Sequence, residues 1–125
     1  MQDITPKIAE GRKQLEAYGD GGFRVNGQKY GGSIVISPFF VESLNVEEIS
    51  QVKEEDISKL ISEQKDIEFL LVGSGEVSDF LLPEIERKLK ENNIIIEYMA
   101  TGAAARTYNI LLSEERKFAA ILIAV

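Results

Sequence analysis

The spacing of hydrophobic positions changes part-way along this chain. From about residue 14 to 46, glycines separate short alternating runs, which predict antiparallel strands near 13–18, 22–26, 29–37 and 39–46. The pair Asn26-Gly27 predicts a tight hairpin, because both central positions of such a turn need a positive φ. From about Glu54 the apolar residues recur about every 3.6 positions instead, which is typical of helices that bury one face.

The second half of the chain alternates helices with strongly apolar strands. Helices are predicted from about Glu54, over about 80–92 and over about 102–113, and strands over 67–72, 94–99 and 117–125. This alternation favours parallel strands joined by crossovers. We therefore predict an α/β (mixed α+β) fold in one domain over residues 1–125. Its antiparallel N-terminal strands are packed on, or continuous with, a parallel C-terminal sheet with covering helices. The strand at 67–72 lies between the other two parallel strands or to one side of them.

The stretch from Met99 to Val125 is the most informative part of the sequence. Thr101 is a predicted N-cap, because its hydroxyl can accept from free backbone N–H groups of the first helical turn. Residues Phe118 to Val125 have almost no polar interruption, which predicts a strand covered on both faces. The helix between them has an apolar face (Ala104, Tyr108, Leu111, Leu112) and a polar stripe (Arg106, Asn109, Ser113).

Composition narrows the chemistry. The chain contains no cysteine and no histidine, which excludes a disulfide framework, the usual nucleophilic triads, a histidine base and an ordinary zinc site. No cofactor, metal site or catalytic residue is predicted. No apolar run approaches the roughly 20 residues of a membrane-spanning helix, and the N-terminus lacks the apolar stretch of a signal peptide. We expect a protein of the bacterial cytoplasm, or of mitochondria if the source is eukaryotic.

The negative charge is concentrated in one segment. The net charge is −7, and residues 42–68 hold nine acidic and three basic side chains, including Lys65 and Asp66. Phosphate backbones would be repelled, so nucleic acid is not an expected partner. The segment is either a docking face for a basic partner or, as we prefer, a solvated helix surface.

Two predicted turns could form a small anion site. In α/β sheets, ligands bind beyond the carboxyl ends of the parallel strands. There, two loops lead into helices whose N-termini attract anions, and Arg106 could add a charged fork. The candidate ligand-binding residues are Gly73, Ser74, Gly75, Thr101, Gly102, Arg106 and Asn109. The glycines lack the third glycine of a dinucleotide fingerprint and the lysine of a phosphate loop, so turn geometry is the preferred interpretation.

Several of these residues have a structural alternative. Arg106 could instead pair with Glu97, Glu114 or Glu115. Asn109 is predicted to bond a neighbouring backbone segment rather than a ligand. Tyr108 is predicted to be a core aromatic with its hydroxyl at the rim.

An aromatic pair outside this stretch has its own prediction. The adjacent residues Phe39-Phe40 on an extended segment point to opposite faces, so one ring could be exposed. An exposed ring would favour a partner surface, but core packing is the preferred interpretation.

The C-terminal sequence resembles a known family. TGAAARTYNILLSEERKFAAILIAV is similar to the signature of a small uncharacterised domain family, and Arg106 to Asn109 are its most specific part. The family includes the mitochondrial respiratory complex I assembly factor and the adipogenesis-associated protein. The hairpin GGFRVNGQKYGGSIVISP, the LLVGSG turn and the IIIEYMATG strand agree in order.

The resemblance implies a three-layer fold, in which a β-sheet joins an α/β unit, with no established enzymatic activity. It implies a non-catalytic protein-interaction or assembly module whose partners are proteins. The residues themselves suggest an alternative function. The chain would then be a protein that binds a small anionic ligand or a nucleotide, or an enzyme, and would use a crevice at Gly73–Glu76 and Thr101–Arg106. The oligomeric state is left open.

Overall fold

The computed structural model of the chain describes residues 2–4, 11–63, 67–77 and 79–125. Its strands form one four-stranded and one five-stranded sheet. The elements in chain order are β1 (Gln2–Asp3), β2 (Leu15–Gly19), β3 (Gly22–Val25), β4 (Gln28–Gly31), β5 (Ser33–Ile36), β6 (Val41–Leu44), the 3-10 helix η1 (Ile49–Gln51), α1 (Glu54–Glu63), β7 (Phe69–Gly73), α2 (Pro83–Glu91), β8 (Ile95–Met99), α3 (Thr101–Ser113) and β9 (Phe118–Leu122).

The small sheet is antiparallel, with the order β1-β2-β3-β4. The hairpin between β3 and β4 is confirmed: Asn26 and Gly27 have φ values of 47° and 80°, and Val25 pairs with Gln28. Glycine and asparagine tolerate this left-handed backbone, which is why the turn forms here. The two-residue strand β1, which pairs with β2, was not predicted.

The single strand predicted over 29–37 was wrong. Gly32 has a φ of 84°, which interrupts the extended backbone. β4, before it, belongs to the small sheet, whereas β5, after it, belongs to the large one. The alternating pattern continues through Gly32, so only the local backbone conformation reveals the change of sheet.

The large sheet is mixed, with the order β6-β5-β9-β7-β8. β7 runs parallel to both β8 and β9, so the prediction of parallel C-terminal strands is confirmed, and β7 lies between the other two. β5 is antiparallel to β9 and joins the two parts of the sheet. The sequence allowed the N-terminal strands either to continue the parallel sheet or to pack on it, and both occur. β5 and β6 continue the sheet, and β1–β4 form a separate one.

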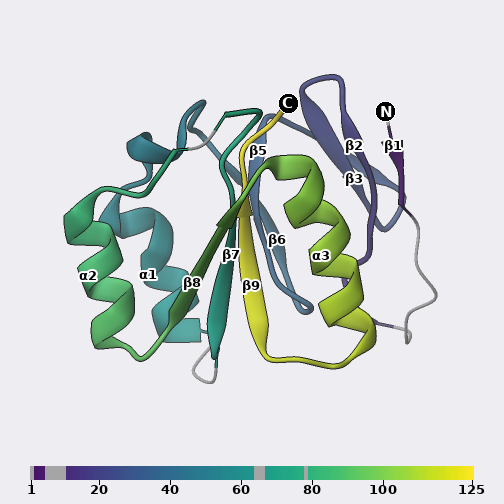
Figure 1. Cartoon of the computed structure of the whole chain (residues 1–125). Helices are drawn as coiled ribbons and strands as arrows, with labels where there is room; N and C mark the ends of the chain where they lie inside the picture. Colours follow the sequence, from purple (N-terminus) through teal and green to yellow (C-terminus); the bar gives the residue numbers. More distant parts are fainter. Residues whose placement is uncertain (1, 5–10, 64–66, 78) are drawn as a thin grey trace.

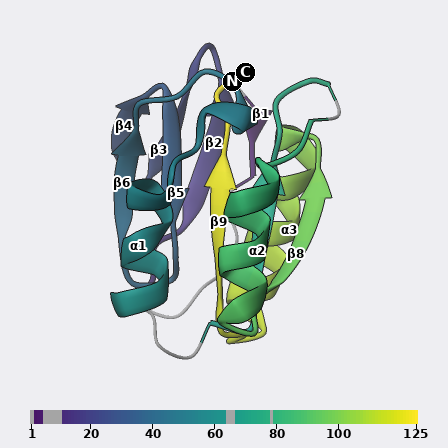
Figure 2. The same ribbon diagram turned by 90° about the vertical axis from the view of Figure 1, so that its left-hand side faces the viewer.

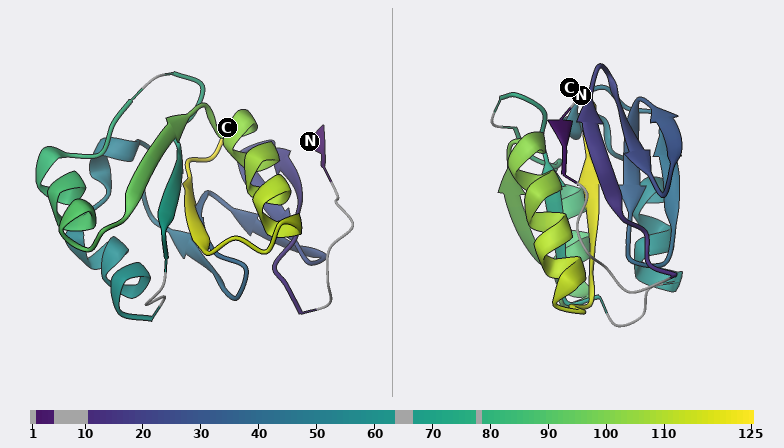
Figure 3. Two further views of the ribbon diagram at one scale, coloured as in Figure 1. Left: turned by 60° about the horizontal axis from the view of Figure 1, so that its bottom comes forward. Right: turned by 90° about the vertical axis from the view of Figure 1, so that its right-hand side faces the viewer.

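The molecule has three layers (Figure 1). Helices α1 and α2 lie side by side over one face of the large sheet, as Figure 2 shows. Helix α3 and the small sheet cover the opposite face, which is visible in both views of Figure 3. This arrangement confirms the predicted mixed α/β fold in three layers.

Strand β9 has apolar side chains on both faces of the large sheet, so both faces need to be covered. Phe118, Ala120 and Leu122 belong to the core on the α3 side. Ala119 and Ile121, which alternate with them, belong to the core on the α1 and α2 side. All five residues of β9 are buried, as expected for a strand with no polar face.

Helix α2 begins at Pro83, three residues later than predicted, with the proline in its first turn. Proline is tolerated there because its missing N–H would be unpaired in any case. Ile85 and Leu89 are buried as predicted. Asn93, with a φ of 61°, ends the helical segment.

The acidic segment, residues 42–68, includes α1. Its first turn contains Glu54, Glu55 and Asp56, where carboxylates favour the positive end of the helix dipole. Glu54 pairs with Lys88 of α2. Lys65 and Asp66 of the same segment lie outside the described residues.

Candidate functional site

The predicted loops meet at the carboxyl ends of β7, β8 and β9. The N–H of Ser74 donates to the carbonyl of Met99 (3.0 Å), and the N–H of Thr101 donates to the carbonyl of Gly75 (2.9 Å). The N–H of Ile123, just after β9, donates to the carbonyl of Gly73 (2.9 Å). The structure therefore brings Gly73, Ser74, Gly75 and Thr101 together, as parallel strands require.

Thr101 is not the N-cap of α3, contrary to the prediction. Ala100 occupies that position, and no side chain caps the helix there. The Thr101 hydroxyl instead accepts from the N–H of Gly75 (2.9 Å) and donates to the carbonyl of Ile123 (2.7 Å). Its side chain is buried, so it links the loop after β7 to the end of β9.

The other residues of this loop are also engaged within the fold. The Ser74 hydroxyl donates to the carbonyl of Val77 (3.0 Å). A Cβ atom on Gly73 would lie 3.1 Å from the Thr101 Cα atom, so glycine here permits close packing of α3 on β7. Gly75 has a φ of 92°, which most side chains disfavour. Close packing and turn geometry thus account for these glycines.

Tyr18 covers the first turn of α3. A Cβ atom on Gly102 would lie 2.8 Å from the Tyr18 hydroxyl. The same hydroxyl accepts from Nη1 of Arg106 (3.0 Å). Arg106 itself is exposed, so its guanidinium has donors that face solvent near the start of α3.

The alternative ion pairs of Arg106 do not form. Within the part of the chain that the structure describes, no salt bridge joins it to Glu97, Glu114 or Glu115. No local pattern predicts the contact between Arg106 and Tyr18, because 88 positions separate the two residues.

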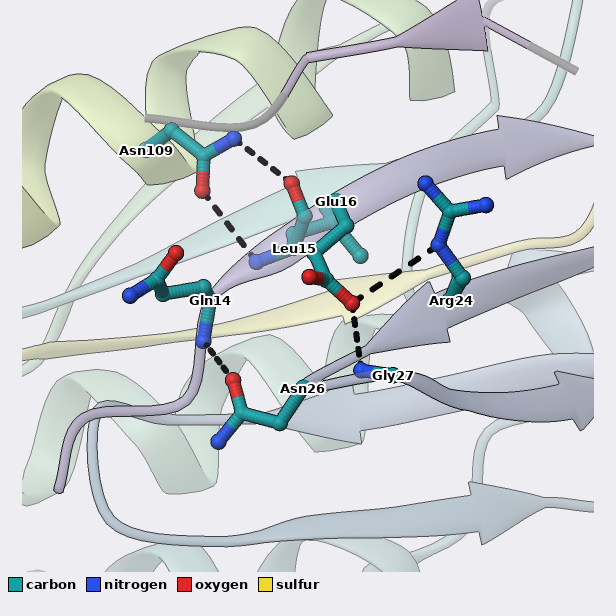
Figure 4. Close-up of polar contacts among 7 residues, drawn as sticks. All are labelled: Gln14, Leu15, Glu16, Arg24, Asn26, Gly27 and Asn109. Carbon is teal, nitrogen blue, oxygen red and sulfur yellow. Dashed lines mark hydrogen bonds and ion pairs between the residues drawn. The ribbon is translucent and has the colours of Figure 1, made fainter. Parts of the chain in front are cut away.

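Asn109 binds backbone atoms with its whole amide group. Its Oδ1 accepts from the N–H of Leu15 (3.3 Å), and its Nδ2 donates to the carbonyls of Leu15 (2.8 Å) and Ile4 (2.9 Å). Figure 4 shows the two bonds that join Asn109 of α3 to Leu15 of β2. The side chain is buried, and these bonds confirm the predicted tie to a neighbouring segment.

The same figure shows how Gln14 and Glu16, on either side of Leu15, are fixed. Asn26 Oδ1 accepts from the N–H of Gln14 (2.8 Å). The Glu16 carboxylate accepts from the N–H of Gly27 and lies 3.7 Å from Nε of Arg24. The polar groups at the start of β2 are therefore held by α3 on one side and by the β3–β4 hairpin on the other.

Tyr108 is a core aromatic, as predicted. It is fully buried against Phe118, with ring centroids 5.1 Å apart. Its hydroxyl donates to the carbonyl of Lys13 (2.8 Å). Burial raises the pKa of Tyr108 far above its usual value, so the phenol stays protonated and serves as a structural donor.

A second region, which the sequence did not single out, exposes apolar side chains. Val77, Phe80 and Leu82 follow β7 and are 72%, 57% and 39% exposed; we call these three residues the apolar loop. The Phe80 ring packs edge-on against Tyr98 of β8, with centroids 4.9 Å apart. Several exposed apolar side chains in one loop make it a candidate protein-binding segment.

Tyr98 connects this loop to α2. Its hydroxyl donates to the carboxylate of Glu86 and accepts from the N–H of Leu81 (3.2 Å). Burial and the adjacent Glu86 raise the pKa of Tyr98 well above its usual range. The neutral phenol therefore fixes the loop after β7 against α2.

Two surface hollows lie away from the predicted crevice. One, of about 610 Å³, lies between the segment 45–54 and the start of α2. The other, of about 520 Å³, lies between α2 and β8 and is lined by Glu86, Lys90, Tyr98 and the residues 93–96.

One ring of the Phe39-Phe40 pair is exposed. Phe39 is 59% exposed, whereas Phe40 packs against the core. The guanidinium carbon of Arg12 lies 4.7 Å from the centre of the Phe39 ring, so a cation covers part of this exposed aromatic.

Two kinds of site are absent from the described ranges. No group of three or more acidic, histidine or cysteine side chains there is placed to hold a metal ion. None of the helices there is long and apolar enough to cross a membrane.

Comparison with known proteins identifies the family. Residues 15–123 match the family described as "Protein of unknown function (DUF498/DUF598)". The chain belongs to this family. The match includes both the loop after β7 and all of α3, and it confirms the resemblance found in the sequence.

Curated relatives carry an assembly-factor name. "NADH dehydrogenase [ubiquinone] 1 alpha subcomplex assembly factor 3" of Xenopus tropicalis is 32% identical over 87% of this chain. The protein of the same name from Danio rerio is also 32% identical, over 96% of this chain and 69% of its own length. The chain spans only 60% of the length of the Xenopus relative.

Solved structures share the fold. A protein described as an outer membrane protein from Bartonella henselae is 40% identical to this chain with a TM-score of 0.84, over 92% of this chain and 97% of its own. A Bordetella pertussis protein described as a Mth938-like domain is 28% identical with a TM-score of 0.72, over 98% of this chain and 92% of its own.

Proposed function

We propose that this chain is a non-catalytic protein-binding module that assists the assembly of a larger complex. The observation that carries the proposal is the contrast at the carboxyl ends of the parallel strands. There, the polar groups of Thr101 and Ser74 are bonded within the fold, while the apolar loop projects into solvent. Such a surface suits a protein partner better than a small polar ligand.

The names of relatives support a partner at a membrane. The Xenopus and Danio proteins are named as assembly factors of NADH dehydrogenase, and the Bartonella protein as an outer membrane protein. We propose that this chain acts on a respiratory or other membrane complex, either from the bacterial cytoplasm or from inside the mitochondrion. The net charge of −7 favours protein over nucleic acid as the partner.

Site-specific photo-crosslinking tests the proposal. A photoreactive phenylalanine analogue is placed at Phe80 or at Ile95, both of which are exposed. The matched control carries it at Gln28, an exposed residue of the small sheet. In the native organism, we expect one discrete adduct from Phe80 or Ile95, enriched in the membrane fraction, and none from Gln28. Equal labelling from all three positions, or no adduct at all, would count against an assembly role.

Anion binding is a second candidate, which the exposure of Arg106 favours. Its guanidinium lies near the first turn of α3, at the predicted crevice. We expect any site there to take a phosphate or carboxylate group. A thermal-shift screen with nucleotides, phosphate and dicarboxylates tests this, with Arg106→Ala as the variant. A saturable rise in Tm that Arg106→Ala abolishes supports the anion site, and a flat screen argues against it.

A further inference from the structure

Strand β8 leaves one row of backbone groups open. Within the part of the chain that the structure describes, it is the terminal strand of the large sheet and pairs with β7 only. The N–H of Ile95 and the carbonyl of Met99 bond toward the β7 side, to Glu68 and Ser74. Because successive residues of a strand direct their backbone groups to opposite sides, Ile96 and Tyr98 present N–H and C=O groups to the outer edge. Figure 2 shows β8 at the margin of the sheet.

The side chains of β8 also alternate. Ile95, Glu97 and Met99 share the face on which α3 lies, and Ile95 is 64% exposed. Ile96 and Tyr98 share the α2 face and line the hollow of about 520 Å³. β8 contains neither proline nor lysine, the residues with which natural edge strands commonly prevent pairing. Its one charged residue is Glu97, which is exposed.

We propose that β8 binds an extended segment of a partner protein, which adds a sixth strand to the large sheet. This inference rests on the proposed function and specifies how the partner is held. The segment carries lysine or arginine at the position that faces Glu97, and apolar residues two positions away on each side, facing Ile95 and Met99. This pattern of one basic residue between two apolar residues reads the same in either strand direction. A partner segment can therefore be recognised by the pattern whether it pairs parallel or antiparallel to β8.

Charge argues for a different protein rather than a second copy of this chain. In an antiparallel pair of two β8 strands, all the outward groups are bonded only when Ile96 pairs with Tyr98 of the other copy. That register places Glu97 directly opposite Glu97 at the closest cross-strand spacing. Like charges in that position are destabilising, whereas opposite charges stabilise the pair. Glu97 therefore opposes self-association and favours a basic partner.

Two synthetic peptides test the proposal. The first is Thr-Val-Thr-Lys-Thr-Val-Thr, and the second has glutamate in place of the central lysine. Backbone amide exchange of the whole protein is followed by NMR with each peptide. We expect the lysine peptide to slow exchange of the Ile96 and Tyr98 amides and to bind about fivefold more tightly than the glutamate peptide.

A charge reversal makes the test specific. Glu97→Lys should invert the preference, so that the glutamate peptide binds more tightly. Glu114→Lys is the matched control: Glu114 is also exposed but lies at the end of α3, and this variant should keep the wild-type preference. Both sites are exposed, so both variants should keep the native amide spectrum.

Self-association is measured separately by sedimentation. We expect a monomeric wild-type protein, and Glu97→Gln should associate more strongly than wild type. Concentration-dependent protection of Ile96 and Tyr98 in wild type without peptide would overturn the proposal in favour of a second copy.

Other outcomes also overturn it: no slowed exchange with either peptide, equal binding of both, or changes confined to the apolar loop. If these occur while Phe80 still crosslinks to a partner, the assembly role stands and the edge-strand mode is wrong. If crosslinking also fails, the proposed function falls with it.

Discussion

Backbone polar groups are in opposite situations in two regions of the molecule. One region is the junction between α3 and β2, and the other is the outer edge of β8. At the junction, Asn109 occupies the N–H and C=O of Leu15, and Tyr108 occupies the carbonyl of Lys13. At the edge, Ile96 and Tyr98 direct their backbone groups away from β7, beside an exposed Ile95. The backbone groups of the first region are bonded within the fold, and those of the second are the ones to which we propose that a partner strand binds.

This difference separates the family signature from the proposed binding surface. In the most recognisable stretch, Arg106 to Asn109, the side chains of Tyr108 and Asn109 are buried, and the exposed Arg106 bonds Tyr18. A recognisable motif can therefore identify a fold without marking where partners bind. The following substitutions test that division.

The largest effect is expected for Asn109→Ala. It leaves one N–H and two carbonyl groups without their partner, so the free energy of unfolding should fall by about 3 kcal/mol. Urea denaturation measures it. Ser113→Ala, at an exposed site on the same helix, is the control and should change it by less than about 0.5 kcal/mol. Equal small losses for both would remove the structural role assigned to Asn109.

Thr101→Val should have the next largest effect. Valine keeps the shape but removes the hydroxyl that bonds Gly75 and Ile123, so we expect a loss of about 2 kcal/mol. Thr107→Val, on the same helix but half-buried, should cost less than about 0.5 kcal/mol. Thermal and urea unfolding compare the two, and a neutral Thr101→Val would show that the hydroxyl bonds are dispensable.

Alkaline pH should weaken the junction through Tyr108. Its pKa is raised by burial in the folded state, so above about pH 10 only the unfolded chain loses this proton. Stability from this group is complete below that pH and declines by about 1.4 kcal/mol per pH unit above it. Tyr108→Phe should show a shallower decline when unfolding is measured from pH 8 to 11.5. Parallel curves would contradict this account.

The smallest effect is expected at the edge. Ile95→Lys should change the free energy of unfolding by no more than about 0.5 kcal/mol, because the side chain is 64% exposed. Ile96→Lys, one residue away, replaces a side chain packed on the core and should cost more than about 1 kcal/mol. Urea denaturation of the pair checks this. If Ile95→Lys is the more damaging variant, Ile95 is part of the fold rather than of a free surface.

Local signals made the fold predictable where neighbours in sequence decide the structure. The Asn26-Gly27 turn, the helical spacing of Ile85 and Leu89, and the apolar run of β9 were sufficient. The split at Gly32 was missed because the alternating pattern continues through it. Thr101 was misassigned because its partners, Gly75 and Ile123, lie more than 20 positions away.

The candidate site was predictable as a place but not as a set of contacts. Parallel strands bring the loop after β7 to the start of α3, as the topology required. The contact of Tyr18 with Gly102 and Arg106 depends on how the small sheet packs on α3, which no local pattern encodes. The open edge of β8 depends on strand order, and that order is decided by long-range pairing.

The position of β9 has a consequence for synthesis. It separates β5 from β7 in the large sheet, yet it follows both of them in the chain. During translation, the β5–β6 hairpin and the β7–β8 pair leave the ribosome before the strand that joins them. Each then has an unpaired inner edge lined with apolar residues, which invites misassociation. Completion of the sheet must therefore await Phe118–Leu122, and a nascent chain stalled before this point is a candidate for chaperone binding.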